Sequence, residues 1–236
     1  MTDYVATAPP QARPAAVAER SAQAPGWVRW VPLAIILCGQ ALLTSRLIHV
    51  STASGDEGRY IYAGHQLIHE IFHGGGSPYY ETYFSGAPVI YPVLAAMADH
   101  LGGLVAVRLM SMSFMMTATA LLYGSGRRLF GYWPGVAAAG LFAGLGLTED
   151  LGALATHDAL ALMLTAASAY CAVRTGDSEK NASRWLVLVP VMLLAANAAK
   201  YATLVFDPVV VRIAALQVLP DGWRRMLTRA TALGVT

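Results

Sequence analysis

Two adjacent carboxylates, Asp56 and Glu57, follow the first long apolar run of the chain within a few residues. A carboxylate in this position can take the proton of an incoming hydroxyl group, which is the role of a general base in group transfer. The acid-rich start of a solvated loop is the alternative interpretation of the same pair. The two acids therefore become candidate catalytic residues only if other reactive groups converge on them.

Further ionisable residues lie within the apolar runs or directly beside them. Glu149 and Asp150 follow a later apolar run, Asp158 lies within the next one, and Lys200 stands between two others. An unpaired carboxylate inside a membrane costs roughly 2.5 to 3.5 kcal/mol, so an ionisable residue in such a run is by default a functional candidate. We expect the acids and Lys200 to converge at one end of a helix bundle.

Three histidines, His65, His69 and His73, are spaced four residues apart. On a helix they form one stripe, and two histidines at this spacing bind zinc when a third ligand is near. An amphipathic interface helix is the alternative, because the same segment also carries an apolar face. A divalent metal at His65 and His69 therefore stays an open hypothesis.

The composition is that of a membrane protein. Of the 236 residues, 56% are hydrophobic and only 13% are charged, whereas soluble domains carry about 25% charged residues. Both cysteines, Cys38 and Cys171, lie inside apolar runs, which excludes a disulfide scaffold. The net charge of +2 gives no indication of a nucleic-acid partner.

The hydropathy pattern predicts an all-α, polytopic transmembrane helix bundle with about six spans. Residues 1–26 have no apolar period and are predicted to be a disordered cytoplasmic arm. A span needs about 20 apolar residues, and candidate runs cover residues 30–47, 104–123, 132–147, 151–173, 185–199 and 201–219. Residues 27–219 would form the membrane domain, and 220–236 a cytoplasmic tail or the start of a truncated next span.

The first loop, about residues 49–103, is the longest polar interruption. It contains residues 87–98, which are apolar but reach only about 18 Å as a helix and cannot cross a bilayer. We therefore expect interface helices in this loop. With the amino terminus inside, eleven of the sixteen Lys and Arg residues fall on the cytoplasmic side and all six histidines on the other. The positive-inside rule then predicts a multi-pass plasma-membrane protein with its reactive groups at the outer face.

Five segments resemble, in order, the C-type fold of polytopic glycosyltransferases, specifically the protein O-mannosyltransferase and aminoarabinose transferase family that uses polyprenyl-phosphate sugars. They are DEGRYIYAG after the first span, YPVLAAMADHLGGLVAVRLMS before the second, RRLFG after it, THDALALMLTAASAY in the fourth and NAAKYATLVFDP at the fifth and sixth. No single segment is specific, so the order and spacing over residues 30–210 carry the resemblance. Relatives typically have interface helices in the first outer loop.

The resemblance implies a single displacement with inversion at the sugar carbon, in which Asp56 activates the acceptor hydroxyl and Glu57 lies beside it. The leaving group would be a lipid phosphate, whose charge needs a fixed cation nearby. Lys200 is the first candidate for that donor-phosphate contact and Arg108 the second, although Arg108 could instead snorkel to the interface. Asp158 would hold Lys200 or the acceptor, or merely pair with a neighbouring helix.

Other side chains are candidates for supporting roles in the same reaction. Glu149 and Asp150 would be further supporting acids. Contacts with the acceptor or the sugar are expected from one basic and five aromatic residues: Arg59, Tyr60, Tyr79, Tyr80, Tyr83 and Phe84. An aromatic belt without a ligand is the alternative for the last four.

The sequence therefore predicts a membrane glycosyltransferase. It would move a sugar from a polyprenyl-phosphate donor to a hydroxyl of a protein, lipid or polysaccharide at the outer face of the bilayer. A secondary transporter and a non-catalytic lipid-binding membrane subunit are the alternatives. Members of the family that it resembles are longer, so the chain is expected to be an amino-terminal part, which as a fragment could bind donor without turning it over.

Overall fold

The computed structural model describes residues 28–49, 52–75, 80, 84–85, 90–177 and 179–218, with the backbone alone for 179–181, and also residues 228, 231 and 233. The predicted arm, residues 1–26, lies outside this part, as does nearly all of the predicted tail. Within the described part all regular structure is helical. The predicted all-α class is confirmed.

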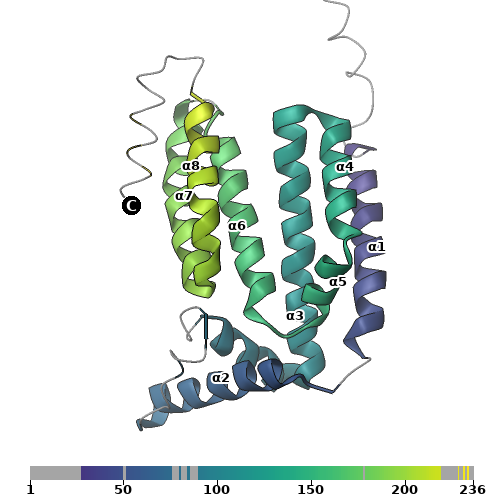
Figure 1. Ribbon diagram of the computed structural model, residues 1–236, viewed down its shortest axis with the longest axis vertical. Helices are drawn as coiled ribbons and strands as arrows, with labels where there is room; N and C mark the ends of the chain where they lie inside the picture. Colours follow the sequence, from purple (N-terminus) through teal and green to yellow (C-terminus); the bar gives the residue numbers. More distant parts are fainter. Residues whose placement is uncertain are drawn as a thin grey trace, which may run out of the picture.

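The helices form an upright bundle with one helix lying across its end. In chain order the elements are η3 (Val28–Trp30), α1 (Val31–Ile48), α2 (Gly55–His73), α3 (Ile90–Phe130), α4 (Tyr132–Ala143), α5 (Gly146–Ala153), α6 (His157–Arg174), α7 (Glu179–Ala199), η5 (Tyr201–Phe206) and α8 (Asp207–Leu216). Figure 1 shows α1, α3, α4, α6, α7 and α8 upright and alternating in direction, whereas α2 crosses one end, here called the α2 end.

Three helical segments are long and apolar enough to cross a membrane: Val28–Ile48, Ile90–Phe130 and Ala182–Ala199. Helices α4 and α5 meet at a bend of 61° and would make a fourth as one broken span. Helix α6 and the pair η5 and α8 run beside them without meeting the same limits of length and hydropathy. The protein is thus an all-α polytopic membrane protein in which three or four of the six predicted spans satisfy these criteria.

A capping box fixes the start of α2. The side-chain oxygen of Ser54 accepts a hydrogen bond from the backbone N–H of Glu57 at 3.3 Å, and the Glu57 carboxylate accepts one from the backbone N–H of Ser54 at 2.8 Å. This reciprocal pair satisfies two groups that a helix start otherwise leaves unpaired. As a result, Asp56 is held in the first turn of α2.

Helix α3 is kinked at two glycines. Gly103 has a φ of +65°, a conformation that glycine adopts at little cost. The part of α3 before this kink lies beside α2 across the end of the bundle (Figure 1), where a separate helix was predicted over residues 87–98. The helix runs on through Asp99 and His100 and breaks at Gly102 and Gly103.

Helices α2 and α3 approach each other closely at Gly64. A Cβ atom at this position would lie 1.9 Å from the backbone oxygen of Pro92. Glycine is therefore required if α2 is to lie this near to α3. The contact places the first part of α2 against a core that contains Tyr60, Tyr91 and Val107.

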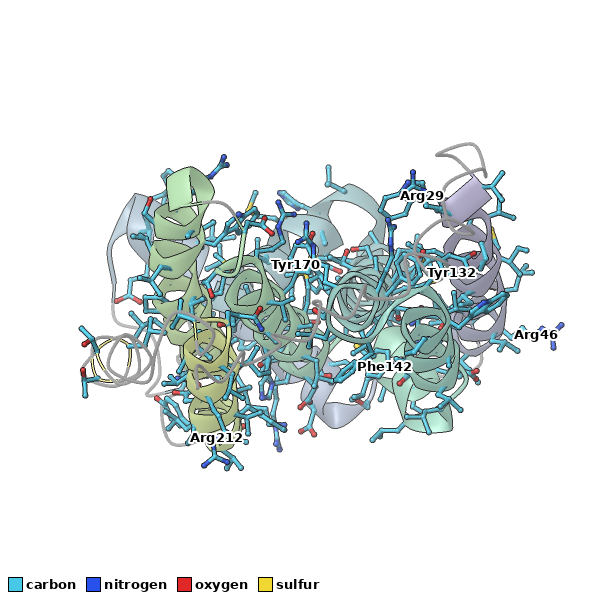
Figure 2. All side chains as sticks on the ribbon, turned by 90° about the horizontal axis from the view of Figure 1, so that it is seen from above. Arg29, Arg46, Tyr132, Phe142, Tyr170 and Arg212 are labelled. Carbon is cyan, nitrogen blue, oxygen red and sulfur yellow. The ribbon has the colours of Figure 1, made fainter. Side chains whose placement is uncertain are left out.

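Apolar side chains cover the outside of the bundle. Leu141 and Val205, for example, are 74% and 75% exposed. Exposed apolar surface is unfavourable in water, whereas lipid tails are as apolar as leucine. In the view from above in Figure 2, Arg46 and Arg212 point away from the bundle on opposite sides. The exterior therefore suits a bilayer, as the composition indicated.

Candidate functional site

One pocket at the α2 end brings together residues from four separate parts of the chain. Its volume is about 280 Å³. Six of its residues were suggested as site residues from the sequence. The lining comprises Asp56, Arg59 and Tyr60 from α2, Phe84 and Ser85 from the segment before α3, Thr156, His157 and Asp158 at the start of α6, and Lys200 between α7 and η5.

Asp56 is the accessible carboxylate of the pocket. Its side chain is 75% exposed, and its nearest cation is Arg59 on the next turn of α2, with an N–O distance of 3.6 Å. An ion pair this exposed is weak. Asp56 is thus within reach of a ligand in the pocket.

Lys200 and Asp158 form an ion pair across the pocket wall. Both side chains are largely but not fully buried. Lys200 is held by its backbone, because its N–H donates to the carbonyl of Ala196 at 2.9 Å and the next N–H, of Tyr201, donates to the carbonyl of Ser85 at 2.7 Å. The pocket therefore carries a fixed cation that is neutralised by a carboxylate.

The position of Asp158 corrects one step of the sequence argument. The fourth span was predicted to begin at residue 151 and to contain Asp158, with Lys200 as one of its possible partners. In the structure residues 151–153 end α5, and Asp158 lies in the first turn of α6, paired with Lys200. The cost of an unpaired carboxylate within the membrane does not apply to it.

Glu57 is buried and fully occupied, unlike its neighbour Asp56. One carboxylate oxygen accepts from Arg108 Nε at 2.9 Å and from the backbone N–H of Ala155 at 2.7 Å. The other accepts from an Arg108 terminal nitrogen at 2.8 Å and from the backbone N–H of Ser54. Burial alone would raise the pKa of Glu57, but these hydrogen bonds outweigh it and lower the pKa to about 2.

Arg108 does not lie where its predicted role as a ligand of the donor phosphate would require it. The residue is 2% exposed and is not part of the pocket lining. Besides its two bonds to Glu57, it donates to the backbone carbonyls of Ile48 at 2.6 Å and Thr52 at 3.4 Å. Arg108 and Glu57 together tie the end of α1, the start of α2, the upright part of α3 and the linker before α6. This clamp positions Asp56.

The other predicted acids and histidines lie away from the pocket. Glu149 and Asp150 belong to α5 and are not among its lining residues. His65 pairs with Asp99 at 2.8 Å, whereas the ring of His69 stacks on another histidine. Among the described residues no three metal-binding side chains lie close enough to hold an ion. The sequence hypothesis of a metal at His65 and His69 therefore finds no third ligand in this part of the chain.

The tyrosines of the first loop divide into two groups. Tyr60 lines the pocket. Tyr80 donates its hydroxyl to Gln66 and stacks on Phe84, with ring centroids 5.6 Å apart, so it supports the wall from behind. The predicted contacts of Tyr79 and Tyr83 fall outside the described residues.

Phe84, which the sequence suggested as a contact with the sugar or the acceptor, lines the pocket. Three other lining residues were not predicted as site residues: Ser85, Thr156 and His157. The sequence carried a signal for two of them, since Thr156 and His157 directly precede Asp158 in the segment THDALAL. Nothing in the spacing marked Ser85. It reaches the pocket because its side chain lies 3.1 Å from His157 and its carbonyl binds the N–H of Tyr201.

Comparison with known proteins identifies the family of the chain. Neither the curated proteins nor the solved structures include a match to this chain. The family model described as dolichyl-phosphate-mannose-protein mannosyltransferase matches residues 87–236. This range includes Asp158 and Lys200 but not Asp56, which only the fold brings to the same pocket. Because the match covers more than half of the chain, the protein belongs to the dolichyl-phosphate-mannose-protein mannosyltransferase family.

Proposed function

We propose that the protein transfers a sugar from a polyprenyl-phosphate donor to an acceptor hydroxyl, with inversion, at the outer face of the plasma membrane. Membership of the family already makes it a membrane glycosyltransferase that uses a polyprenyl-phosphate sugar. The observation that carries the finer proposal is the presence of an accessible carboxylate, Asp56, and a fixed ammonium group, Lys200, in one pocket.

In the proposed reaction Asp56 is the general base. The acceptor oxygen attacks the anomeric carbon as its proton passes to the Asp56 carboxylate. The bond between that carbon and the phosphate oxygen breaks, and the lipid phosphate leaves with the electron pair. Attack from the face opposite the leaving group inverts the anomeric centre. Because Glu57 is saturated by four donors, its contribution is to hold the start of α2 rather than to take the proton.

Lys200 is proposed to stabilise the phosphate as negative charge develops on it. An ammonium group placed before the reaction costs no reorganisation in the transition state. Its present partner, Asp158, occupies the position that a phosphate would compete for. Asp158 therefore holds Lys200 in place between turnovers and yields part of its contact when donor binds.

The distribution of charge supports the outer face as the side of the reaction. Arg127 and Arg128 end α3 and Arg174 ends α6, at the end of the bundle opposite α2. The positive-inside rule places such residues in the cytoplasm. The same assignment implies that the pocket at the α2 end faces the outside and that α1 begins on the cytoplasmic side.

The test is transfer of labelled mannose from dolichyl phosphate mannose in membranes that carry the full-length gene product. Asp56→Asn keeps the size of the side chain but removes the base, so we expect transfer to fall by at least about a hundredfold, the lower end of what a positioned general base contributes. Asp150→Asn is the matched control, because Asp150 is an exposed acid of α5 that does not line the pocket. Equal transfer by both variants would move the base elsewhere. Absence of transfer in the wild type would contradict the proposed activity itself.

A further inference from the structure

The pocket has a neutral wall that the proposed reaction does not use. Tyr60 and Phe84 stack with their ring centroids 4.7 Å apart at an interplanar angle of 22°, and the His157 ring lies 4.9 Å from that of Tyr60. Ser85 joins this group through its hydrogen-bond contact with His157. Tyr60 and Phe84 are each 8% exposed, so the wall is rigidly packed.

His157 is poised to hold the Ser85 hydroxyl in one orientation. Its Nε2 lies 3.1 Å from Ser85 Oγ, whereas its Nδ1 is buried and has no hydrogen-bond partner in the described part of the chain. A buried N–H without a partner is more costly than a bare lone pair. We therefore assign the proton of the neutral ring to Nε2, which donates to Ser85.

Within the described part of the chain, this assignment leaves the Ser85 hydroxyl proton available to bind a ligand. A serine oxygen has one proton to donate and two lone pairs. One lone pair accepts from His157, so the O–H is not needed there, and Ser85 itself is exposed at the pocket. Its backbone carbonyl is also fixed, by the N–H of Tyr201. Ser85 is thus a hydrogen-bond donor with a set position.

We infer that this wall is the subsite for the transferred sugar: Ser85, oriented by His157, donates to a sugar oxygen while the stacked rings of Tyr60 and Phe84 contact the apolar face of the sugar ring. The inference rests on the proposed function. A sugar combines C–H surface with hydroxyl groups, and a ligand pocket recognises such a molecule with aromatic walls and a few placed polar groups. The charged lining residues, by contrast, match the phosphate and the acceptor. Ser85 is therefore a binding residue, and His157 a positioning residue that acts through it.

The experiment compares two lipid probes on the purified full chain in nanodiscs: dolichyl phosphate mannose, which carries the sugar, and dolichyl phosphate, which lacks it. Ser85→Ala should weaken binding of the first by about three- to tenfold, the value of one hydrogen bond, and leave binding of the second unchanged. His157→Leu should do the same. His157→Gln should restore most of the loss, because its amide can donate to Ser85 from nearly the position of Nε2.

The outcomes separate this inference from the proposed function. Lys200→Met should weaken binding of both probes, since both carry the phosphate. If Ser85→Ala and His157→Leu weakened the two probes equally, or neither, the sugar subsite would be wrong while the phosphate role of Lys200 stood. A wild-type protein that bound neither probe would overturn the proposed function, and the subsite with it. Failure of His157→Gln to recover binding would contradict the assigned tautomer and the positioning role.

Discussion

The clamp between Arg108 and Glu57 offers a direct test of what the fold adds to the sequence. We consider Arg108→Met, which keeps much of the length and apolar stem of the side chain but removes its charge. Glu57 would then remain buried, with only the backbone N–H groups of Ser54 and Ala155 to neutralise it. Removing one partner of a buried ion pair costs about 3 to 5 kcal/mol.

The lowered pKa of Glu57 reflects the net effect of all its surroundings, Arg108 included. The difference between 4.5 and about 2 corresponds to about 3 kcal/mol. Because the folded pKa lies below the unfolded one, this contribution is fully present above about pH 4.5 and is lost as the pH falls towards 2. The backbone N–H groups of Ala155 and Ser54 supply part of this lowering and remain after the substitution. The cost of breaking the buried ion pair therefore sets the expected value: Arg108→Met should lower the free energy of unfolding by about 3 kcal/mol at neutral pH, with a smaller difference from the wild type below pH 4.

The assay is unfolding of the purified full chain in mixed micelles by increasing SDS, followed by tryptophan fluorescence and circular dichroism. Arg212→Met is the control, because Arg212 is exposed and points away from the bundle (Figure 2). Arg108→Lys should recover only part of the stability, since lysine cannot make the two-pronged contact with a carboxylate. The reasoning is refuted if Arg108→Met unfolds like the wild type but loses affinity for dolichyl phosphate. That result would restore the phosphate role predicted from the sequence.

Two further predictions follow from close contacts at the α2 end. Gly64→Ala would place a methyl group 1.9 Å from the Pro92 carbonyl oxygen, and overpacking of this kind costs typically about 1–3 kcal/mol. Unfolding by SDS should show this loss of stability. The control is Gly58→Ala, where nothing lies within 4 Å of the added methyl group, and this variant should be no less stable than the wild type. Asp158→Asn should tighten binding of dolichyl phosphate by up to about fivefold, because the phosphate would no longer compete with a carboxylate for Lys200 and such partly exposed pairs contribute up to about 1 kcal/mol. Weaker binding to the nanodisc-embedded variant would instead mean that Asp158 is required to hold Lys200 in place.

The sequence by itself determined the class of the protein and much of its candidate site. Apolar runs, a low share of charge and the alternation of runs with polar breaks are properties of the local chain, and the transfer of each residue into lipid depends little on its distant neighbours. For the same reason Asp56, Asp158 and Lys200 could be singled out as reactive groups beside apolar runs. The pocket includes all three.

Only the tertiary structure decided which charges neutralise one another. Glu57 and Arg108 are 51 positions apart in the chain, and Asp158 and Lys200 are 42 apart. Both arginine and lysine were reasonable phosphate ligands from their types alone. No local pattern could show that Arg108 binds the backbone of α1 and of the linker between α1 and α2, whereas Lys200 lines the pocket. Ion pairs depend on distances of a few ångströms between side chains, and those distances are set by how the helices pack.

The same reason explains the residues that were missed. Ser85 has no distinguishing neighbours in the sequence, and its significance comes from a contact with His157, 72 positions away. The kink at Gly103 and the close contact at Gly64 bring α2 and the first part of α3 together across the end of the bundle. Hydropathy predicted that these segments would stay near the membrane surface, whereas packing decided that the start of α2 would line the pocket.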